Sequence, residues 1–495
     1  MTDVTSGLSR RIASVLCIDA SAPAIEFEKR WRSWGDLGAT VDAVADMVGE
    51  PGTPFGILLR SRPLSVGLLL GVFRAGGCVV AINPQRGVDR TRADIADLAL
   101  PIVAGEPADL DTHVGRPSQS VLITADDLGT DLRVTRCADT WSSPALPGVA
   151  VRMLTSGTTG PPKRVDLRYD TLVRVLAGAK HYEGGRGSGN GLRHGVAVVN
   201  SPLVHLGGLF RVLQCINDGR SFSLLERFTV DGWVDAVRRH RPKTVSLVPT
   251  ALRMVLEADL DPSDLSSVRS VVSGTAPLSS EDADAFSAKY GVPVLISYAA
   301  TEFGGGVAGW NLKDHRRFWA EKRGSVGRAH AGCLLRTIDT RTGEQLAPDE
   351  VGLLEVRAGQ LGSDAPWIRT TDLARIDEDG FLFIVGRADQ AIIRGGFKIH
   401  PDDISAALER HPRVRGAAVI GVDHARLGAV PVAVVELRPG PPLDTDELLA
   451  FISGALARYE LPTKLILVEK LPRTPSAKVD LSAIRALVAS EVADR

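Results

Sequence analysis

The sequence predicts a large α/β domain that ends in a small antiparallel β region and is followed by a small α+β domain. Two observations support this prediction. Short Val- and Ile-rich segments alternate with helical patterns between about residues 55 and 302, which indicates parallel sheets covered by helices. After residue 386, helix and strand patterns alternate again in a shorter stretch of chain.

The first strand–helix–strand unit lies near the N-terminus. Residues 55–59 form a short apolar run typical of a buried strand, residues 64–73 resemble a buried helix, and residues 77–84 resemble the next strand. The pattern then recurs, with expected strands followed by expected helices at 195–203 and 207–217, 244–249 and 250–258, and 267–274 and 279–291, and with a further strand at 292–302.

The pattern of expected strands and helices changes from about Arg323. Short strands and turns over 334–357, and an Asp-Gly turn between apolar residues over 377–387, indicate an antiparallel β region with a hairpin. We expect a boundary near residues 386–389, which divides the chain into domains of residues 1–386 and 387–495.

Composition narrows the class of protein. The 495 residues are 44% hydrophobic and 24% charged with a formal charge of -1, which is typical of a globular protein and gives no reason to expect a nucleic-acid partner. Five dispersed cysteines without a CxxC pair support neither a disulfide framework nor a zinc site. No signal peptide is recognisable, and the run at 64–73 is too short to span a membrane, so we expect a cytoplasmic protein.

A polar segment, "LTSGTTGPPKRV" at residues 154–165, follows an expected strand. Its hydroxyls, glycine N–H groups and Lys163 are the donors that a polyphosphate needs. It is not a Walker A loop, because Pro161 and Pro162 separate Gly160 from the lysine. A surface turn with an incidental lysine is the alternative interpretation.

Four further residues could have a binding or catalytic role, and each also has a purely structural interpretation. Glu302 could hold Mg²⁺ or be a solvated glutamate. Asp372 could accept hydrogen bonds from a ribose or cap a turn. Lys478, on a Pro-rich turn, could reach into a site formed by other segments or remain at the surface. His205 could be functional or structural.

Taken in order, these segments resemble the adenylate-forming superfamily, which includes acyl-CoA synthetases, aryl-CoA ligases, firefly luciferase and peptide-synthetase adenylation domains. The resemblance covers nearly the whole chain. It is carried by "LTSGTTGPPKRV", "SGTAPL" (273–278), "YAATE" (298–302), "GSVGR" (324–328), "RTTDL" (369–373), "GRADQAIIRGGFKIHPDDI" (386–404) and "PRTPSAKVD" (472–480).

The resemblance implies an acid–thiol ligase that uses ATP, Mg²⁺ and coenzyme A. A carboxylate would attack the α-phosphate of ATP to give acyl-AMP and pyrophosphate, and a thiol would then displace AMP. It implies four catalytic groups, Lys478, Glu302, Thr301 and His205, with Glu302 also on the metal. It implies that ATP and AMP contact Thr155, Ser156, Gly157, Thr158, Thr159, Gly160, Lys163, Gly274, Thr275, Ala276, Pro277, Tyr298, Thr301, Asp372, Arg387 and Lys478.

The resemblance also implies that the C-terminal domain turns between the two half-reactions about a hinge at Asp389. The CoA-binding residues would be Gly395, Gly396 and Lys398, and the candidates for the acyl pocket are His205, Gly207, Gly208, Thr250, Ser297 and Ala299, with Gly274 beside them. Three positions depart from the family pattern, since Thr371, Ala299 and Ala477 stand where glycines are usual.

Several small pocket residues favour a fatty, bulky alicyclic or aryl acid as the substrate. Two alternative functions remain open at this point. The protein could load a carrier protein in trans instead of CoA, or it could be a nucleotide-binding sensor without turnover. The oligomeric state is also open, with a homodimer among the possibilities.

Overall fold

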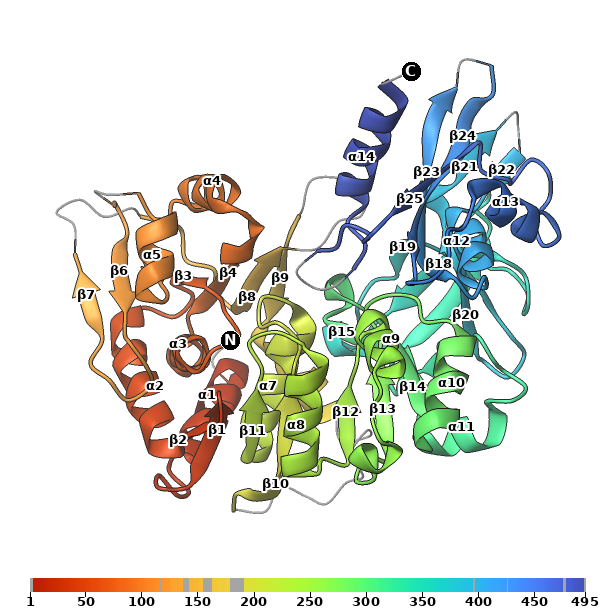
Figure 1. The fold of residues 1–495 in the computed structure, drawn as a ribbon. Helices are drawn as coiled ribbons and strands as arrows, with labels where there is room; N and C mark the ends of the chain where they lie inside the picture. Colours follow the sequence, from red (N-terminus) through yellow and green to blue (C-terminus); the bar gives the residue numbers. More distant parts are fainter. Residues whose placement is uncertain are drawn as a thin grey trace.

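The computed structural model describes residues 3–115, 118–136, 142–154, 163–178, 191–394, 397–424, 426–474 and 478–493. These residues form five sheets with helices packed around them. Figure 1 shows the last sheet and its helices, in blue, stacked on one end of the other sheets. The structure is thus the mixed α/β architecture that the sequence predicts.

The largest sheet has the strand order β7-β6-β5-β3-β4-β8-β9. Its inner strands pair in parallel, and the edge strands β7 and β9 are antiparallel to their neighbours. The strands are β3 (Pro54–Leu58), β4 (Cys78–Ile82), β5 (Ile102–Ala104), β6 (Val121–Thr124), β7 (Arg133–Thr135), β8 (Val149–Leu154) and β9 (Arg164–Arg168). The helices of this part are α1 (Asp3–Leu16), α2 (Trp34–Val48), α3 (Pro63–Ala75), α4 (Val88–Leu98), α5 (Pro107–His113) and α6 (Tyr169–Gly178).

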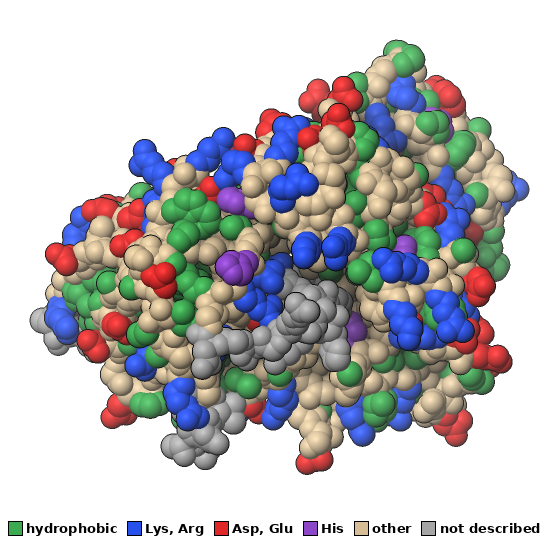
Figure 2. Space-filling view, turned by 90° about the horizontal axis from the view of Figure 1, so that it is seen from below, with side chains coloured by type: hydrophobic (Ala, Val, Ile, Leu, Met, Phe, Trp, Pro, Cys, Tyr) green, Lys and Arg blue, Asp and Glu red, His purple; other side chains and the backbone are tan. Residues whose placement is uncertain are grey.

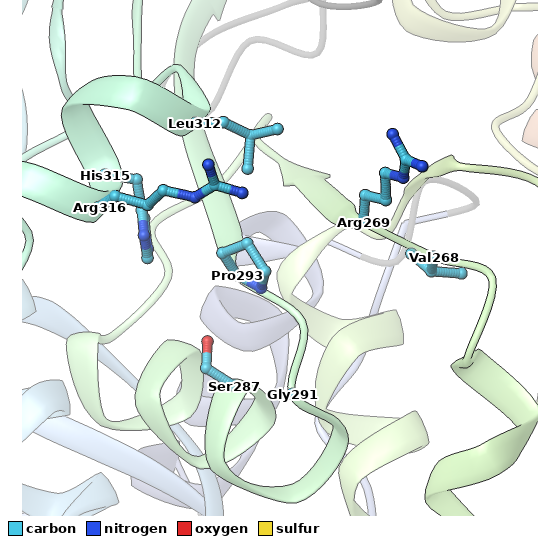
Figure 3. Close-up of a pocket in the computed structure, with 8 residues that line it drawn as sticks. All are labelled: Val268, Arg269, Ser287, Gly291, Pro293, Leu312, His315 and Arg316. Carbon is cyan, nitrogen blue, oxygen red and sulfur yellow. The ribbon is translucent and has the colours of Figure 1, made fainter.

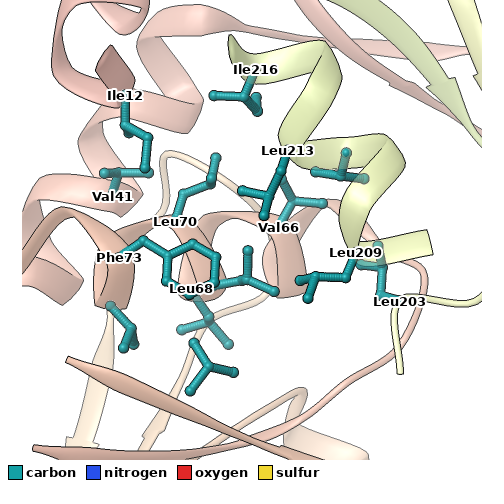
Figure 4. Packing of buried hydrophobic residues seen from close by; sticks show 14 of the residues in the cluster. Ile12, Val41, Val66, Leu68, Leu70, Phe73, Leu203, Leu209, Leu213 and Ile216 are labelled. Carbon is teal, nitrogen blue, oxygen red and sulfur yellow. The ribbon is translucent and has the colours of Figure 1, made fainter. Parts of the chain in front are cut away.

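A second sheet, with the order β10-β11-β1-β2, lies next to α1 and α7. Its strands are β1 (Pro23–Phe27), β2 (Arg30–Ser33), β10 (Arg193–Val199) and β11 (Arg220–Leu224), and its helices are α7 (Leu206–Asp218) and α8 (Val230–His240). Ser33 ends β2 and caps α2 in a reciprocal capping box with Asp36. Helix α3 is buried along nearly its whole length, because α1, α2 and α7 all pack around it (Figure 4).

The third sheet carries part of the predicted site. Its order is β12-β13-β14-β15-β16, and β12, β13 and β14 are parallel. The strands are β12 (Thr244–Ser246), β13 (Ser270–Ser273), β14 (Val294–Ala300), β15 (Gly305–Gly309) and β16 (Arg328–Ala329), and the helices are α9 (Pro249–Glu257), α10 (Ser280–Tyr290) and α11 (Leu312–Phe318).

The fourth sheet is the predicted antiparallel region. It consists of β17 (Leu334–Ile338), β18 (Gly352–Arg357), β19 (Ile368–Ile376) and β20 (Leu382–Arg387), paired in that order. The Asp-Gly turn between β19 and β20 confirms the predicted hairpin, since Gly380 has a φ of 80° and its N–H donates to the carbonyl of Asp377 at 2.9 Å.

The last sheet and its helices form what we call the C-terminal unit. Its strands are β21 (Ile392–Arg394), β22 (Phe397–Ile399), β23 (Val414–His424), β24 (Gly428–Leu437) and β25 (Lys464–Val468), and its helices are α12 (Pro401–Glu409), α13 (Thr445–Ser453) and α14 (Leu481–Ala493). Two clusters of buried apolar side chains, both drawn only from residues after 391, pack on the two faces of this sheet. The unit therefore has a core of its own.

The motif at residues 324–328 has a structural function that depends on one glycine. Gly327 has a φ of 94°, and a β-carbon there would lie 2.1 Å from the carbonyl carbon of Gly309. The carbonyl of Gly327 accepts from the Leu382 N–H at 2.9 Å, so this residue joins the third sheet to the fourth.

We therefore expect Gly327→Ala to lower the free energy of unfolding by about 3 kcal/mol or more, because both the left-handed backbone and the close backbone contact exclude a β-carbon. Gly343→Ala is the matched control. Gly343 also has a positive φ of 74°, but no atom lies within 4 Å of the added carbon. Its cost should be about 1 kcal/mol. Equal costs in chemical denaturation would contradict the packing argument.

Candidate active site

A half-buried tyrosine and an aspartate hold one side of the candidate site. The Tyr298 hydroxyl, near the carboxyl end of β14, donates a short hydrogen bond to Asp372 on β19. The Asp372 N–H in turn donates to Thr370 Oγ1 at 3.0 Å. Burial, together with the negative charge of Asp372, raises the pKa of Tyr298, so this phenol stays protonated as a donor.

Arg387 joins this pair to the start of the C-terminal unit. It faces Asp372 across the β19–β20 ladder, with 3.7 Å between Nη1 and Oδ1. It also makes two hydrogen bonds, of 3.0 and 2.8 Å, to the carboxylate of Asp389. Burial opposes the charge of Arg387, but the two carboxylates outweigh it and raise its pKa. Three predicted residues thus form one ion-pair cluster, with the predicted hinge residue as a member.

Lys478 comes from the C-terminal unit and lies within electrostatic range of two residues of other elements. Burial lowers its pKa, while the nearby carboxylate of Glu302 acts in the opposite direction. The positive charge of Lys478 also lowers the pKa of His205, which lies at the start of α7. The fold therefore brings a cation, a carboxylate and an imidazole together from three distant parts of the sequence.

His205 is a neutral imidazole in this setting. Burial, with a contribution from the charge of Lys478, lowers its pKa from 6.5 to about 4. Its Nε2 is buried and makes no hydrogen bond to any residue that the structure describes. Such a group is available to a ligand.

The segment at 273–278 runs beside β14. Gly274 approaches so closely that a β-carbon there would lie 2.9 Å from the Ser297 carbonyl oxygen. Thr275 has a φ of 72°, a strained conformation for a β-branched residue. Ala276 is half-buried and Pro277 is exposed. A strained, partly exposed turn at the end of a parallel strand is a common feature of ligand sites.

The predicted acyl-pocket residues divide into three groups. Gly207 and Ala299 are exposed, and Ser297 and His205 are half-buried. Gly208 adds no room for a ligand, because a β-carbon there would lie 2.3 Å from the Pro202 carbonyl oxygen. Thr250, at the start of α9, accepts a hydrogen bond of 3.1 Å from Arg473 of the C-terminal unit.

Some predicted residues lie outside the described part of the chain, namely Thr155, Ser156, Gly157, Thr158, Thr159, Gly160, Gly395 and Gly396. Lys163 is exposed directly before β9, and the backbone of Lys398 lies in β22. Thr301 and Glu302 occupy the short turn after β14, where Glu302 is exposed. Of the glycine replacements, Thr371 is an exposed residue within strand β19, where a β-branched residue is favourable.

Three residues between helix α9 and the C-terminal unit were not predicted from the sequence. Arg473, Arg253 and Glu257 make contacts between α9 and the C-terminal unit. A signal exists in retrospect, because Thr250, Arg253 and Glu257 are spaced as one polar face of a helix.

A surface cavity of about 700 Å³ lies at the opposite edge of the third sheet. Arg269 and Pro293, directly before β13 and β14, line it together with Leu312 and Arg316 (Figure 3). Figure 2 views the molecule from below and shows Lys and Arg side chains gathered near the middle of that face. The amino ends of the parallel strands lie here, whereas Tyr298 and Thr301 lie at the carboxyl end of β14. The cavity is therefore separate from the candidate site.

Within the described ranges, no group of three or more His, Cys, Asp or Glu side chains is arranged to hold a metal ion. The donor set still suits Mg²⁺, which usually binds through one or two carboxylates together with phosphate oxygens and water. Among the same residues, no helix has the length and apolar character needed to cross a membrane.

The chain belongs to the AMP-binding enzyme family. The family matches residues 19–363, and its C-terminal domain matches residues 403–478. The chain is 28% identical over 471 residues to a 2-succinylbenzoate–CoA ligase of Bacillus pumilus, covering 91% of this chain and 92% of that protein. It is 29% identical over 489 residues to the 4-coumarate–CoA ligase-like 8 of Arabidopsis thaliana, covering 90% and 86%.

Among solved structures, the chain resembles ATP-bound MatB from Rhodopseudomonas palustris, with a TM-score of 0.80, 25% identity, and coverage of 97% of this chain and 98% of that one. The apo structure of MatB has the same identity and coverage but a TM-score of 0.67. The arrangement of this chain is thus more similar to the ATP-bound form. These comparisons establish a member of the AMP-binding enzyme family, and the two curated relatives are named as a CoA ligase and a CoA-ligase-like protein.

The low pKa of His205 predicts a pH-dependent stability. The folded pKa of about 4 lies below the ordinary 6.5, so the unfolded chain binds this proton first and stability is lost as the pH falls from about 6.5 towards 4. His205→Asn should remove this loss. Between pH 7 and pH 5, the variant should gain roughly 1–2 kcal/mol of unfolding free energy relative to the wild type.

Urea denaturation at the two pH values measures this difference. His194→Asn, at an exposed position, controls for the loss of an imidazole as such. Parallel stability curves for the wild type and His205→Asn would contradict the burial of a neutral imidazole.

Proposed function

We propose that the protein activates a carboxylic acid with ATP, releasing pyrophosphate, and then transfers the acyl group from acyl-AMP to the thiol of coenzyme A. The observation that carries this proposal is the approach of Lys478 to Glu302 and His205, beside the cluster of Tyr298 and Asp372. In this proposal, a nucleotide, a metal ion and a reacting acid would occupy separate places in the site.

In the first half-reaction, a carboxylate oxygen bonds to the α-phosphorus of ATP while the bond to the bridging oxygen of pyrophosphate breaks. Both partners are anions, so positive charge must be concentrated between them. Lys478 would supply one positive charge from the C-terminal unit. Its partial burial strengthens the interaction, because water screens it less.

Bound Mg²⁺ would supply further positive charge, with Glu302 and the phosphate oxygens as its ligands. Thr301, beside Glu302, would contact the α-phosphate. The exposure of Glu302 favours this assignment, because a metal ion in the site could reach its carboxylate. The hydroxyls and N–H groups of residues 155–160, with Lys163, would hold the outer phosphates.

The nucleoside would lie against the other side of the site. Asp372 would accept hydrogen bonds from the ribose, and Tyr298 and the segment from Gly274 to Pro277 would flank the adenine. Arg387 helps to orient Asp372 through its position across the β19–β20 ladder. The greater similarity to ATP-bound than to apo MatB supports this arrangement as the one for adenylation.

In the second half-reaction, the CoA sulfur attacks the acyl carbonyl carbon and AMP leaves. We propose that the C-terminal domain, residues 387–495, turns about Asp389 between the two steps. The segment with Gly395, Gly396 and Lys398 would then line the path of the CoA arm. Asp389 already shares Arg387 with Asp372, which places a charged contact at the proposed hinge.

For the acid, we propose a fatty, bulky alicyclic or aryl substrate. The relatives named as a 2-succinylbenzoate–CoA ligase and a 4-coumarate–CoA ligase-like protein favour the aryl class. A neutral His205 fits an uncharged acyl body, and exposed Gly207 and Ala299 leave space at its sides. Pyrophosphate release with a panel of acids, with and without CoA, identifies the substrate.

Two other functions are separated by the same assay. A holo-carrier protein that accepts the acyl group faster than free CoA does would favour a carrier-loading enzyme. No pyrophosphate release with any acid would favour a nucleotide-binding sensor.

Lys478→Ala should reduce acyl-AMP formation roughly 100-fold or more, because the anionic transition state loses its cation. Thioester formation from supplied acyl-AMP and CoA should change little. Lys470→Ala, an exposed lysine eight positions upstream, is the control and should keep both half-reactions. An equal loss in both half-reactions of Lys478→Ala would contradict the assigned role.

A further inference from the structure

One face of α9 carries the contacts that hold the C-terminal unit in place. Thr250, Arg253 and Glu257 lie one above another at helical spacing. Figure 1 shows α9 on the side of the lower sheets that faces the C-terminal strands. Each of the three side chains contacts a residue of the C-terminal unit, so α9 is a docking surface for that unit.

Arg253 makes the middle contact. Its Nε donates to Asp282 of α10 at 2.6 Å, and its Nη2 donates to Glu409 of α12 at 2.9 Å. This arginine thus bridges a carboxylate of the lower sheets and a carboxylate of the C-terminal unit.

The contacts of Thr250 and Glu257 belong to one continuous network of side chains. The network closes through helix α9 itself, and we call it the α9 ring. It consists of Thr250, Arg473, Glu436, Arg415 and Glu257. Arg473 donates to Thr250 at 3.1 Å and lies 3.4 Å from Glu436. Arg415 lies 3.6 Å from the same carboxylate and donates to Glu257 at 2.6 Å. The chain of contacts therefore leaves α9 at one turn and returns two turns later.

Glu436, at the centre of the ring, is buried on β24 with 4% of its surface exposed. A carboxylate at such a depth needs partners, and the two arginines together with the Leu471 N–H, at 3.0 Å, provide them. The ring is therefore a constrained structure and differs from a set of solvated surface pairs.

Arg473 is the member of the ring that leads to Lys478. The two residues lie on the two arms of one small hairpin, in which Arg473 pairs with Val479. The Thr474 N–H donates to the Lys478 carbonyl at 2.7 Å, and the Asp480 N–H donates to the Pro472 carbonyl at 2.9 Å. A displacement of Arg473 would therefore move the backbone of Lys478.

We propose that Arg473 is a positioning residue for the adenylation step. By joining Thr250 of α9 to the buried Glu436, it fixes the hairpin that carries Lys478 at the candidate site. This inference rests on the proposed function only in naming adenylation as the step that Lys478 assists. The docking itself is a property of the folded chain.

Arg473→Ala should lower kcat for pyrophosphate release at least about 10-fold, because a small displacement of a reacting group has a large kinetic cost. KM for ATP should stay within about twofold, since the nucleotide contacts other than Lys478 lie on other elements. Thioester formation from supplied acyl-AMP should be unchanged. Arg473→Lys should recover only part of the rate, because an ammonium cannot reproduce the fork that reaches two partners.

The variant should remain folded, since Glu436 keeps the Leu471 N–H and Arg415 as partners. Thr250→Val, which removes only the hydroxyl acceptor on α9, provides an independent second variant and should give a smaller loss of kcat in the same direction. Arg485→Ala is the control, because this exposed arginine on α14 lies outside the ring.

Hydrogen exchange by mass spectrometry gives a readout that does not depend on activity. In Arg473→Ala, the peptide over residues 468–480 should exchange faster than in the wild type, while peptides of β23 should be unchanged. Wild-type exchange in this peptide and a kcat within twofold of wild type would overturn the proposal. If the wild type itself released no pyrophosphate with any acid, the proposed function would fail, and the exchange result would still decide whether Arg473 anchors the hairpin.

Discussion

The candidate site exists only while the C-terminal unit is docked on α9. Lys478 belongs to a unit with its own apolar core, and Glu302 and His205 belong to other sheets and helices. The contacts that hold the parts together are largely polar, with Arg253 between two carboxylates as an example. Separating two parts that are joined by polar contacts costs less free energy than separating parts joined by an apolar core. The reason is that water can replace the lost polar contacts. A joint of this type suits the proposed turn of the C-terminal domain between the two half-reactions.

The part of the candidate site around Tyr298 and Asp372 is held together by a different kind of contact. Tyr298 and Asp372 come from strands of two sheets, and Gly327 ties those sheets together through a backbone contact that no side chain could enter. Arg387 faces Asp372 from the adjacent strand and also holds Asp389. The part of the site with Tyr298 and Asp372 is thus built on sheet hydrogen bonds, whereas the segment that carries Lys478 is anchored to α9 and β24 by side-chain contacts of Arg473.

Much of the fold could be predicted from local patterns. The apolar run at 64–73 lies within α3, and the Asp-Gly turn before Phe381 forms the expected hairpin. The antiparallel edge strands β7 and β9 were not predicted, because their short, partly exposed sequences carry no strong alternation. The contacts of Arg473 and Glu257 were also missed, since each depends on a partner far away in the sequence.

The sequence by itself determined the elements, the order of the motifs and the residue types that the chemistry needs, because these follow from local periodicity and from side-chain chemistry. Only the tertiary structure decided that Lys478 lies near His205, that Thr250 is held by Arg473, and that Gly208 serves backbone packing. The physical reason is that distance and burial arise from the packing of remote segments. A lysine on a Pro-rich turn has the same local sequence whether it lies in water or near other ionisable side chains.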